Sequence, residues 1–89
     1  MLRRRIIFEG RVQGVGFRWN TKDALAALAV TGYVQNLTDG SVELLIEGSS
    51  SEVNDAQGRV EKRMLGYWKS REWDDLSGDP HYQDFSIRY

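Results

Sequence analysis

The chain has 89 residues, of which 40% are hydrophobic and 28% are charged, and its formal net charge at pH 7 is -1. This length predicts one domain, residues 1–89, with a single modest hydrophobic core. The slight negative charge disfavours nucleic acid as a partner, because nucleic-acid binders usually carry a basic surplus. No run approaches the roughly 20 apolar residues that cross a bilayer, and we expect a monomeric cytoplasmic protein with no membrane partner.

The residue types that are missing exclude several kinds of chemistry. The chain has no cysteine, so disulfides, cysteine-ligated zinc and thiol catalysis are excluded. Its one histidine, His81, follows Pro80 in a polar stretch and is expected to be an exposed loop side chain. One imidazole cannot form a multi-histidine metal site, although carboxylates alone could hold magnesium or calcium. Among metal sites, these residue types therefore leave only a carboxylate site open.

The first third of the chain predicts a strand, a glycine-rich turn and a helix. Residues 5–12 alternate apolar and polar side chains, which is the period of a strand. The arginines at 3–5 before it are expected at a solvated strand end. Apolar residues then recur at spacings of three and four over 17–29, which predicts a helix. Gly32 stands where a glycine commonly follows a helix C-terminus.

A hairpin is predicted in the middle of the chain. Residues 33–38 and 41–47 both have strand-like alternation. Between them lies Asp39-Gly40, and Asp-Gly between two alternating runs is the strongest short-range signal of a hairpin.

The rest of the chain predicts a second helix and one or two strands. A serine in 49–51 can cap a helix over about 52–65, because its hydroxyl accepts a hydrogen bond from an unpaired amide. Residues 67–73 are predicted as a strand and 74–81 as a turn-rich loop. The alternation over 82–89 indicates a closing strand, which either joins the main sheet or forms a short extra strand.

The order βαββαβ predicts an α+β fold of the ferredoxin-like class. Two split βαβ units give an antiparallel sheet with both helices on one face, with a possible short fifth strand. This fold carries many unrelated activities, so its function has to be argued from a site.

The main candidate site is the glycine-rich loop Gln13, Gly14, Val15, Gly16, Phe17 and Arg18. A strand that turns into a helix through such a loop can aim several backbone N–H groups at one anion, and the helix start adds partial positive charge. The planar guanidinium of Arg18 can donate two parallel hydrogen bonds to phosphate oxygens. No Gly-Lys-Ser/Thr follows, so this is not a magnesium-nucleotide loop. From glycine spacing alone, a tight connection with an exposed arginine is the favoured interpretation.

Asn36 is the second candidate residue. It shares a strand face with Val34, which is expected to point toward the core, and a polar residue is unusual there. From the residues alone, an asparagine that bonds local backbone near the hairpin is slightly favoured. Asn36-Leu37-Thr38 also matches a glycosylation acceptor, but no secretory signal precedes it, and we take that match as accidental.

Three stretches resemble one known family. Residues 10–18, Gly-Arg-Val-Gln-Gly-Val-Gly-Phe-Arg, resemble the first motif of the acylphosphatases. Residues 32–43, Gly-Tyr-Val-Gln-Asn-Leu-Thr-Asp-Gly-Ser-Val-Glu, resemble the second motif, and 85–89 are similar to the C-terminal strand of that family. Two long motifs in the right order and at the usual separation form a specific pattern.

The resemblance implies the acylphosphatase fold and the hydrolysis of a small-molecule acyl phosphate to a carboxylate and inorganic phosphate, without a cofactor. It implies that Arg18 and the amides of residues 13–17 bind the phosphate, and that Asn36 positions the attacking water. With no histidine or cysteine nearby, a covalent phosphoenzyme is not expected. Residues 49–81 depart from the family pattern, with Gly66-Tyr67-Trp68 where a Gly-Pro-containing connection is common.

Two other functions stay open from the sequence. One is an accessory relative that binds phosphate-like ligands without useful turnover. The other is a ferredoxin-like RNA-binding module, although its aromatic motif lies on a central strand, whereas these glycines end the first strand. Trp19, Trp68 and Trp73 are interpreted as packing residues, and the acidic residues in 72–75 as a solvated surface.

Overall fold

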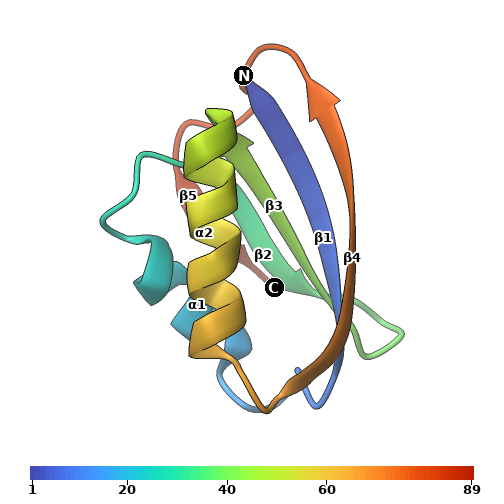
Figure 1. Ribbon diagram of the computed structural model, residues 1–89. Coiled ribbons are helices and arrows are strands. Elements are labelled where there is room, and N and C mark those ends of the chain that lie inside the picture. The colour runs from blue at the N-terminus through green and yellow to red at the C-terminus, as the bar shows by residue number, and fades with distance from the viewer.

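The computed structural model describes residues 1–89 as one five-stranded sheet with both helices on the same face (Figure 1). The elements in chain order are β1 (Leu2–Gly10), α1 (Phe17–Leu25), β2 (Thr31–Asn36), β3 (Val42–Gly48), α2 (Ser50–Arg63), β4 (Trp68–Ser77) and β5 (Phe85–Arg88). The strands lie in the order β4-β1-β3-β2-β5. The predicted ferredoxin-like α+β fold is confirmed. Neither helix is both long and apolar enough to cross a membrane.

The last strand makes the sheet mixed rather than antiparallel. β1 pairs antiparallel with β3 and β4, and β2 pairs antiparallel with β3. β5 pairs parallel with β2, with Gly32 opposite Phe85 and Val34 opposite Ile87. The four strands of the predicted βαββαβ order therefore form an antiparallel sheet, as expected, and the closing strand, whose pairing the sequence left open, joins its edge in parallel with β2.

The core lies between the sheet and the helices. Alternate residues of β1 and β3 face the helices, and the register places Ile6 opposite Leu44 and Phe8 opposite Val42. The apolar residues of α2 recur at the three- and four-residue spacing that one helix face requires. The residues that form this core are Ile6, Phe8, Val12, Phe17, Leu25, Val30, Val34, Val42, Leu44, Ile46, Val53, Ala56, Val60 and Met64.

The first helix is shorter than predicted and does not end at Gly32. It ends at Leu25, where Ala26 N–H bonds the Asp23 carbonyl and Leu28 N–H bonds the Leu25 carbonyl. Such bonds to the third residue back tighten and close a helix. Gly32 lies in β2 with φ 136°, and a Cβ there would lie 1.9 Å from the Leu45 oxygen. The glycine is required by a close approach of two strands and not by a helix end.

The second helix starts at a capping box. Ser49 accepts a hydrogen bond from Glu52 N–H at 3.2 Å, and Ser49 N–H donates to the Glu52 carboxylate at 3.0 Å. The cap is therefore the first of the three predicted serines, and the helix begins at Ser50. Gly58 is exposed inside this helix, with open space where a Cβ would be.

The arginines at the N-terminus are paired and not simply solvated. Arg4 is buried and binds Asp75 through Nε and Nη2, at 2.7 and 3.0 Å. Arg3 pairs with Glu47, and Arg5 pairs with Glu43. These carboxylates come from strands on both sides of β1, so only the sheet register reveals them. β4 continues to Ser77 because it pairs with β1 along its whole length, so residues 74–77 are strand and not loop.

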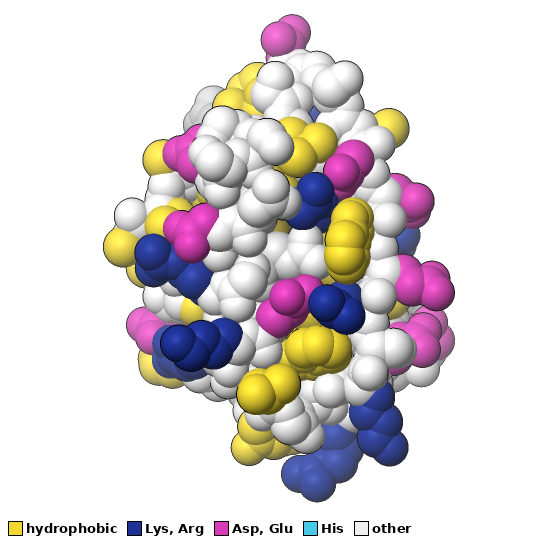
Figure 2. Space-filling model, viewed as in Figure 1, with side chains coloured by type: hydrophobic (Ala, Val, Ile, Leu, Met, Phe, Trp, Pro, Cys, Tyr) yellow, Lys and Arg dark blue, Asp and Glu magenta, His cyan; other side chains and the backbone are white.

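Trp68 and Trp73 both lie on β4, and Trp68 packs as expected, whereas Trp73 is 44% exposed. Trp68 lies against the core, and Arg71 lies over both rings, with its Cζ 4.8 Å from Trp68 and 5.8 Å from Trp73. Figure 2 shows hydrophobic and basic side chains alternating on this part of the surface, and acidic and basic side chains interspersed over the face as a whole.

Candidate active site

The β1–α1 loop, the end of β2 and the end of β5 surround one cavity of about 170 Å³. Its lining residues are Val12, Gly14, Gly16, Phe17, Arg18, Trp19, Asn36, Ile87 and Tyr89. The two residues singled out from the sequence as catalytic, Arg18 and Asn36, thus line the same cavity with both loop glycines.

The backbone of the loop is shaped by two glycines in the left-handed region. Gly14 has φ 75° and Gly16 has φ 76°, conformations that side chains with a Cβ rarely adopt. Gly16 is also the N-cap of α1, with no side chain bonding the helix end. None of the backbone N–H groups of residues 13–16 donates to a protein acceptor. The loop therefore offers several free donors beside a positive helix end, which is the arrangement that binds anions.

Arg18 brings an uncompensated positive charge to the cavity. No carboxylate lies within ion-pair distance of its guanidinium. Its Nη1 donates to the Arg88 carbonyl at 3.3 Å, and its Cζ lies 4.7 Å from the centre of the Tyr89 ring. These contacts orient the side chain and leave other N–H groups free for a ligand.

Asn36 is the last residue of β2, where it pairs with Val42 of β3, and it lines the cavity with a side chain that forms no hydrogen bond to the hairpin turn. The turn is held instead by Asp39, whose carboxylate accepts hydrogen bonds from Ser41 N–H and from Ser41 Oγ. These bonds hold the pKa of Asp39 below its usual value. The expectation of a local backbone role for Asn36 was wrong, and its amide is available to a ligand or to water.

The other loop side chains do structural work. Gln13 donates to the carbonyls of Leu37 and Ser41, at 2.8 and 2.9 Å, and so ties the loop to the hairpin. Val15 packs against the core, and Phe17 is buried with its ring 5.1 Å from that of Phe8. Only the backbone of residues 13 and 15 can serve the site.

A polar link from the second helix also holds the loop. The Asn20 side chain donates to the Gly16 carbonyl at 2.8 Å, and it accepts a hydrogen bond from Arg63 Nε at 3.0 Å. Arg63 also binds Asp23 at 2.8 Å. This link was not predictable from the sequence, because Asn20 and Arg63 are far apart in the chain.

Sequence reasoning missed four residues of the cavity: Val12, Trp19, Ile87 and Tyr89. Trp19 is 62% exposed and so is not the packing residue that was expected. Its position directly after Arg18 at the start of a helix was the available signal. Ile87 and Tyr89 enter the site because β5 joins the sheet, which the sequence left open.

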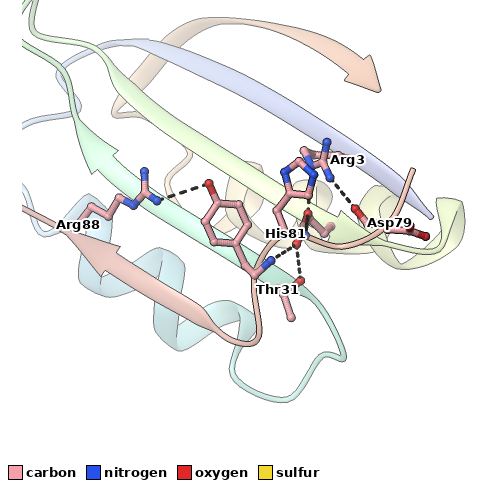
Figure 3. Close-up of polar contacts among 7 residues, drawn as sticks. Arg3, Thr31, Asp79, His81 and Arg88 are labelled. Atoms are coloured by element: carbon pink, nitrogen blue, oxygen red, sulfur yellow. Dashed lines mark hydrogen bonds and ion pairs between the residues drawn. The ribbon is translucent and has the colours of Figure 1, made fainter. Parts of the chain in front are cut away.

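A buried carboxylate holds the segment that leads into β5 (Figure 3). Glu47 accepts hydrogen bonds at one oxygen from Thr31 Oγ1 and Tyr82 N–H, at 2.8 and 3.1 Å. Its other oxygen accepts from Arg3 Nε and His81 N–H, at 3.0 and 2.7 Å. Burial would raise the pKa of Glu47, but these donors outweigh that effect and hold the pKa below its usual value. The His81 side chain itself is exposed, as expected.

Comparison with known proteins identifies the family. A family model described as acylphosphatase matches residues 4–87. The acylphosphatase of Picrophilus torridus is 36% identical over 87 residues, covering 93% of this chain and 98% of that protein. The acylphosphatase of Pelotomaculum thermopropionicum is 34% identical, covering 98% and 96%. The crystal structure of acylphosphatase from Bacillus subtilis covers 100% of both chains, with a TM-score of 0.90 and 32% identity. The chain therefore belongs to the acylphosphatase family of hydrolases.

Proposed function

We propose that the hydrolysis of acyl phosphates takes place in the cavity between the glycine-rich loop and Asn36. One observation supports this assignment above the others. Three groups border the same small cavity. They are the Arg18 guanidinium, which has no carboxylate partner, the loop N–H groups, which donate to no protein acceptor, and the side-chain amide of Asn36, which forms no hydrogen bond. A phosphoryl group needs both charge and directed donors, and this cavity offers both.

Arg18 and the loop amides bind the phosphoryl oxygens in this proposal. The two left-handed glycines keep side chains out of the space that the anion needs, and the start of α1 adds partial positive charge. These donors neutralise the charge on the transferred group as the attacking and leaving oxygens come into line, which is the main contribution of proteins to phosphoryl transfer.

Asn36 positions the attacking water. Its side-chain oxygen accepts a hydrogen bond from the water, whose oxygen attacks phosphorus while the bond between phosphorus and the acyl oxygen breaks. The carboxylate leaves with the bonding electrons, and a phosphoryl oxygen takes the proton of the water. A carboxylate is a good leaving group, so no general acid is required.

The proposal includes neither a metal nor a covalent phosphoenzyme. No group of three or more histidine, aspartate or glutamate side chains is arranged to hold a metal ion. The one histidine, His81, is hydrogen-bonded through its backbone N–H to Glu47, which pairs with the first residue of β2. Asn36 is the last residue of β2, so the histidine lies at the opposite end of that strand. No cysteine or histidine nucleophile borders the cavity.

The direct test is the turnover of benzoyl phosphate by the Arg18→Ala variant. Loss of the charged donor is expected to lower kcat/KM by at least about 10²-fold. Arg11→Ala is the matched control, because Arg11 is exposed and its guanidinium lies over the Tyr67 ring outside the cavity. Near-wild-type turnover by Arg18→Ala would refute the assignment.

The role of Asn36 is separable from that of Arg18. Asn36→Ala is expected to lower kcat while the inhibition constant of inorganic phosphate stays nearly unchanged; lost phosphate binding would instead place Asn36 among the binding groups.

Hydrolysis in ¹⁸O-labelled water should put the label in the phosphate. Label in the carboxylate would show attack at the carbonyl carbon and contradict this mechanism. Turnover should also survive a chelator, and its loss would refute the metal-free scheme.

Phosphate binding without hydrolysis by the wild type would select the accessory-protein alternative. The RNA-binding alternative is disfavoured by the interspersed charges on the face in Figure 2 and by the formal net charge of -1. A monomer in the cytoplasm, without nucleic-acid or membrane partners, stays a prediction, and light scattering on the purified protein would test the monomer.

A further inference from the structure

The catalytic cavity opens into a trough between α1 and β5. Trp19 and Ile87 line both the catalytic cavity and a second hollow of about 320 Å³, which Lys22, Asp23 and Ala26 also border. Lys22 and Ala26 in turn border a third hollow of about 310 Å³. Because neighbouring hollows share lining residues, the three lie next to one another in a row that leads away from the phosphate-binding loop.

The far part of the trough is lined mostly by hydrophobic residues. Five of the six residues that line the third hollow are hydrophobic: Leu25, Ala26, Leu28, Val30 and Phe85. Lys22 is the exception, and it is exposed, so its ammonium group can stay in water while its stem borders the trough. The trough therefore begins at a charged anion site and continues over hydrophobic side chains.

Trp19 stands at the junction between the two regions. Of the three tryptophans it alone takes part in no aromatic pair and in no stacking contact with an arginine, whereas Trp68 and Trp73 both contact Arg71. With 62% of its surface exposed, its indole adds little to the core. A large aromatic side chain left open beside a binding cavity is typical of a ligand contact.

We propose that this trough is the binding site for the acyl group and that it favours acyl phosphates with an extended, apolar chain. This inference rests on the proposed function. With the phosphoryl group held by Arg18 and the loop, the acyl group must leave the cavity at one side. The trough past Trp19 and Ile87 adjoins the catalytic cavity, and most of the residues that line its far end are hydrophobic, as a hydrocarbon chain requires.

The expected preference follows from the burial of methylene groups. A fully buried methylene contributes up to about fourfold to affinity. The trough is open to solvent along one side, so about 1.9-fold for each methylene is expected here. Six methylenes separate octanoyl phosphate from acetyl phosphate, which predicts a kcat/KM higher by about 50-fold for the longer substrate.

The experiment compares kcat/KM for acetyl, butanoyl, hexanoyl and octanoyl phosphate, all below the concentrations at which they form micelles. Ala26→Glu places a carboxylate in the trough and should reduce the octanoyl-to-acetyl ratio from about 50 to below about 5. Ala27→Glu is the matched control, because Ala27 is exposed on the same turn but borders none of the three hollows. Trp19→Ala should also lower the ratio, whereas Trp73→Ala should leave it unchanged.

The outcomes separate this inference from the proposed function. A wild-type enzyme that hydrolyses acetyl phosphate but shows no rise with chain length would overturn the acyl-chain site alone. Faster turnover of benzoyl than of octanoyl phosphate would overturn it in favour of a compact aromatic site at Trp19. If no acyl phosphate is hydrolysed, the proposed function is refuted, and the trough is then tested by measuring the affinity of phosphonates. Octylphosphonate should then bind more tightly than methylphosphonate, and equal binding would refute the trough.

Discussion

Replacing Glu47 with glutamine should destabilise the protein far more than a neutral substitution of the same size suggests. One carboxylate oxygen accepts from Thr31 and Tyr82, and the other accepts from Arg3 and His81. A glutamine presents an NH₂ group in place of one oxygen. In either orientation of the amide, two of the four donors then meet this NH₂ group and lose their acceptor. Glu47 is 1% exposed, and breaking a buried ion pair costs about 3–5 kcal/mol. For a domain of this size, that lowers Tm by about 15–30 °C.

The assay is urea unfolding of the wild type and the Glu47→Gln variant across a range of pH. The folded-state pKa of Glu47 lies below its unfolded value of 4.5. Its contribution is therefore fully present above about pH 5.5 and is lost as the pH falls through the folded pKa. The difference in unfolding free energy between the two proteins should be constant near neutrality and should shrink in acid.

Asp55→Asn is the matched control for this measurement. Asp55 pairs with Arg59 on the exposed side of α2, and such pairs contribute about 0–1 kcal/mol. If Glu47→Gln costs no more than Asp55→Asn, or if the difference persists unchanged into acid, the anchoring role assigned to the carboxylate is wrong.

Four further predictions concern single residues. Arg63→Ala should weaken inhibition by phosphate about three- to tenfold, because the Asn20 side chain loses the bond that steadies it against the loop; Arg59→Ala is the control and should change nothing. Gly32→Ala should cost about 2–6 kcal/mol in urea unfolding, because a Cβ would collide with the neighbouring strand at a left-handed φ. Gly58→Ala, in open space on a helix, should instead stabilise by about 0.5–1 kcal/mol. Burial, and then the nearby charge of Glu43, raise the pKa of Tyr33 to about 12. The contribution of the neutral Tyr33 phenol to the free energy of unfolding should thus be complete below about pH 10 and should be lost as the pH rises through about 12. In an ultraviolet titration, Tyr33→Phe should remove the ionisation near pH 12.

The elements with strong local signals were predictable. Alternation in β1 and β3, the three- and four-residue spacing in α2 and the Asp-Gly turn all follow from the residues themselves. The glycine-rich loop and Arg18 are adjacent in the chain, so the phosphate-binding arrangement is a local property that the sequence carries. Asn36 was found through its motif, and its place at the cavity then follows from the pairing of β2 with β3.

The features that were not predictable depend on contacts between distant segments. Gly32 looked like a helix end because a glycine after an apolar run usually is one, and only the approach of β3 reveals the real constraint. Arg4 looked solvated because Asp75 lies on the strand beside it and not near it in sequence. β5 was ambiguous because four residues carry too little pattern to show which neighbour they pair with.

The phosphate-binding loop depends on local sequence, whereas the trough depends on contacts between distant segments. We therefore expect that a mutation can impair one of them without the other. The free amides of the loop and the charge of Arg18 come from contiguous residues, and they depend on β5 only through the Arg88 carbonyl and the Tyr89 ring. The walls of the trough, in contrast, require Ile87 and Phe85, which lie on the edge strand β5 directly after the segment that is held to Glu47. Glu47→Gln, studied below its lowered Tm, should therefore reduce the octanoyl-to-acetyl ratio more than it weakens phosphate inhibition. Equal losses in the two measurements would show that the loop and the β5 edge act as one unit, because β5 would then hold the arginine as firmly as it forms the trough.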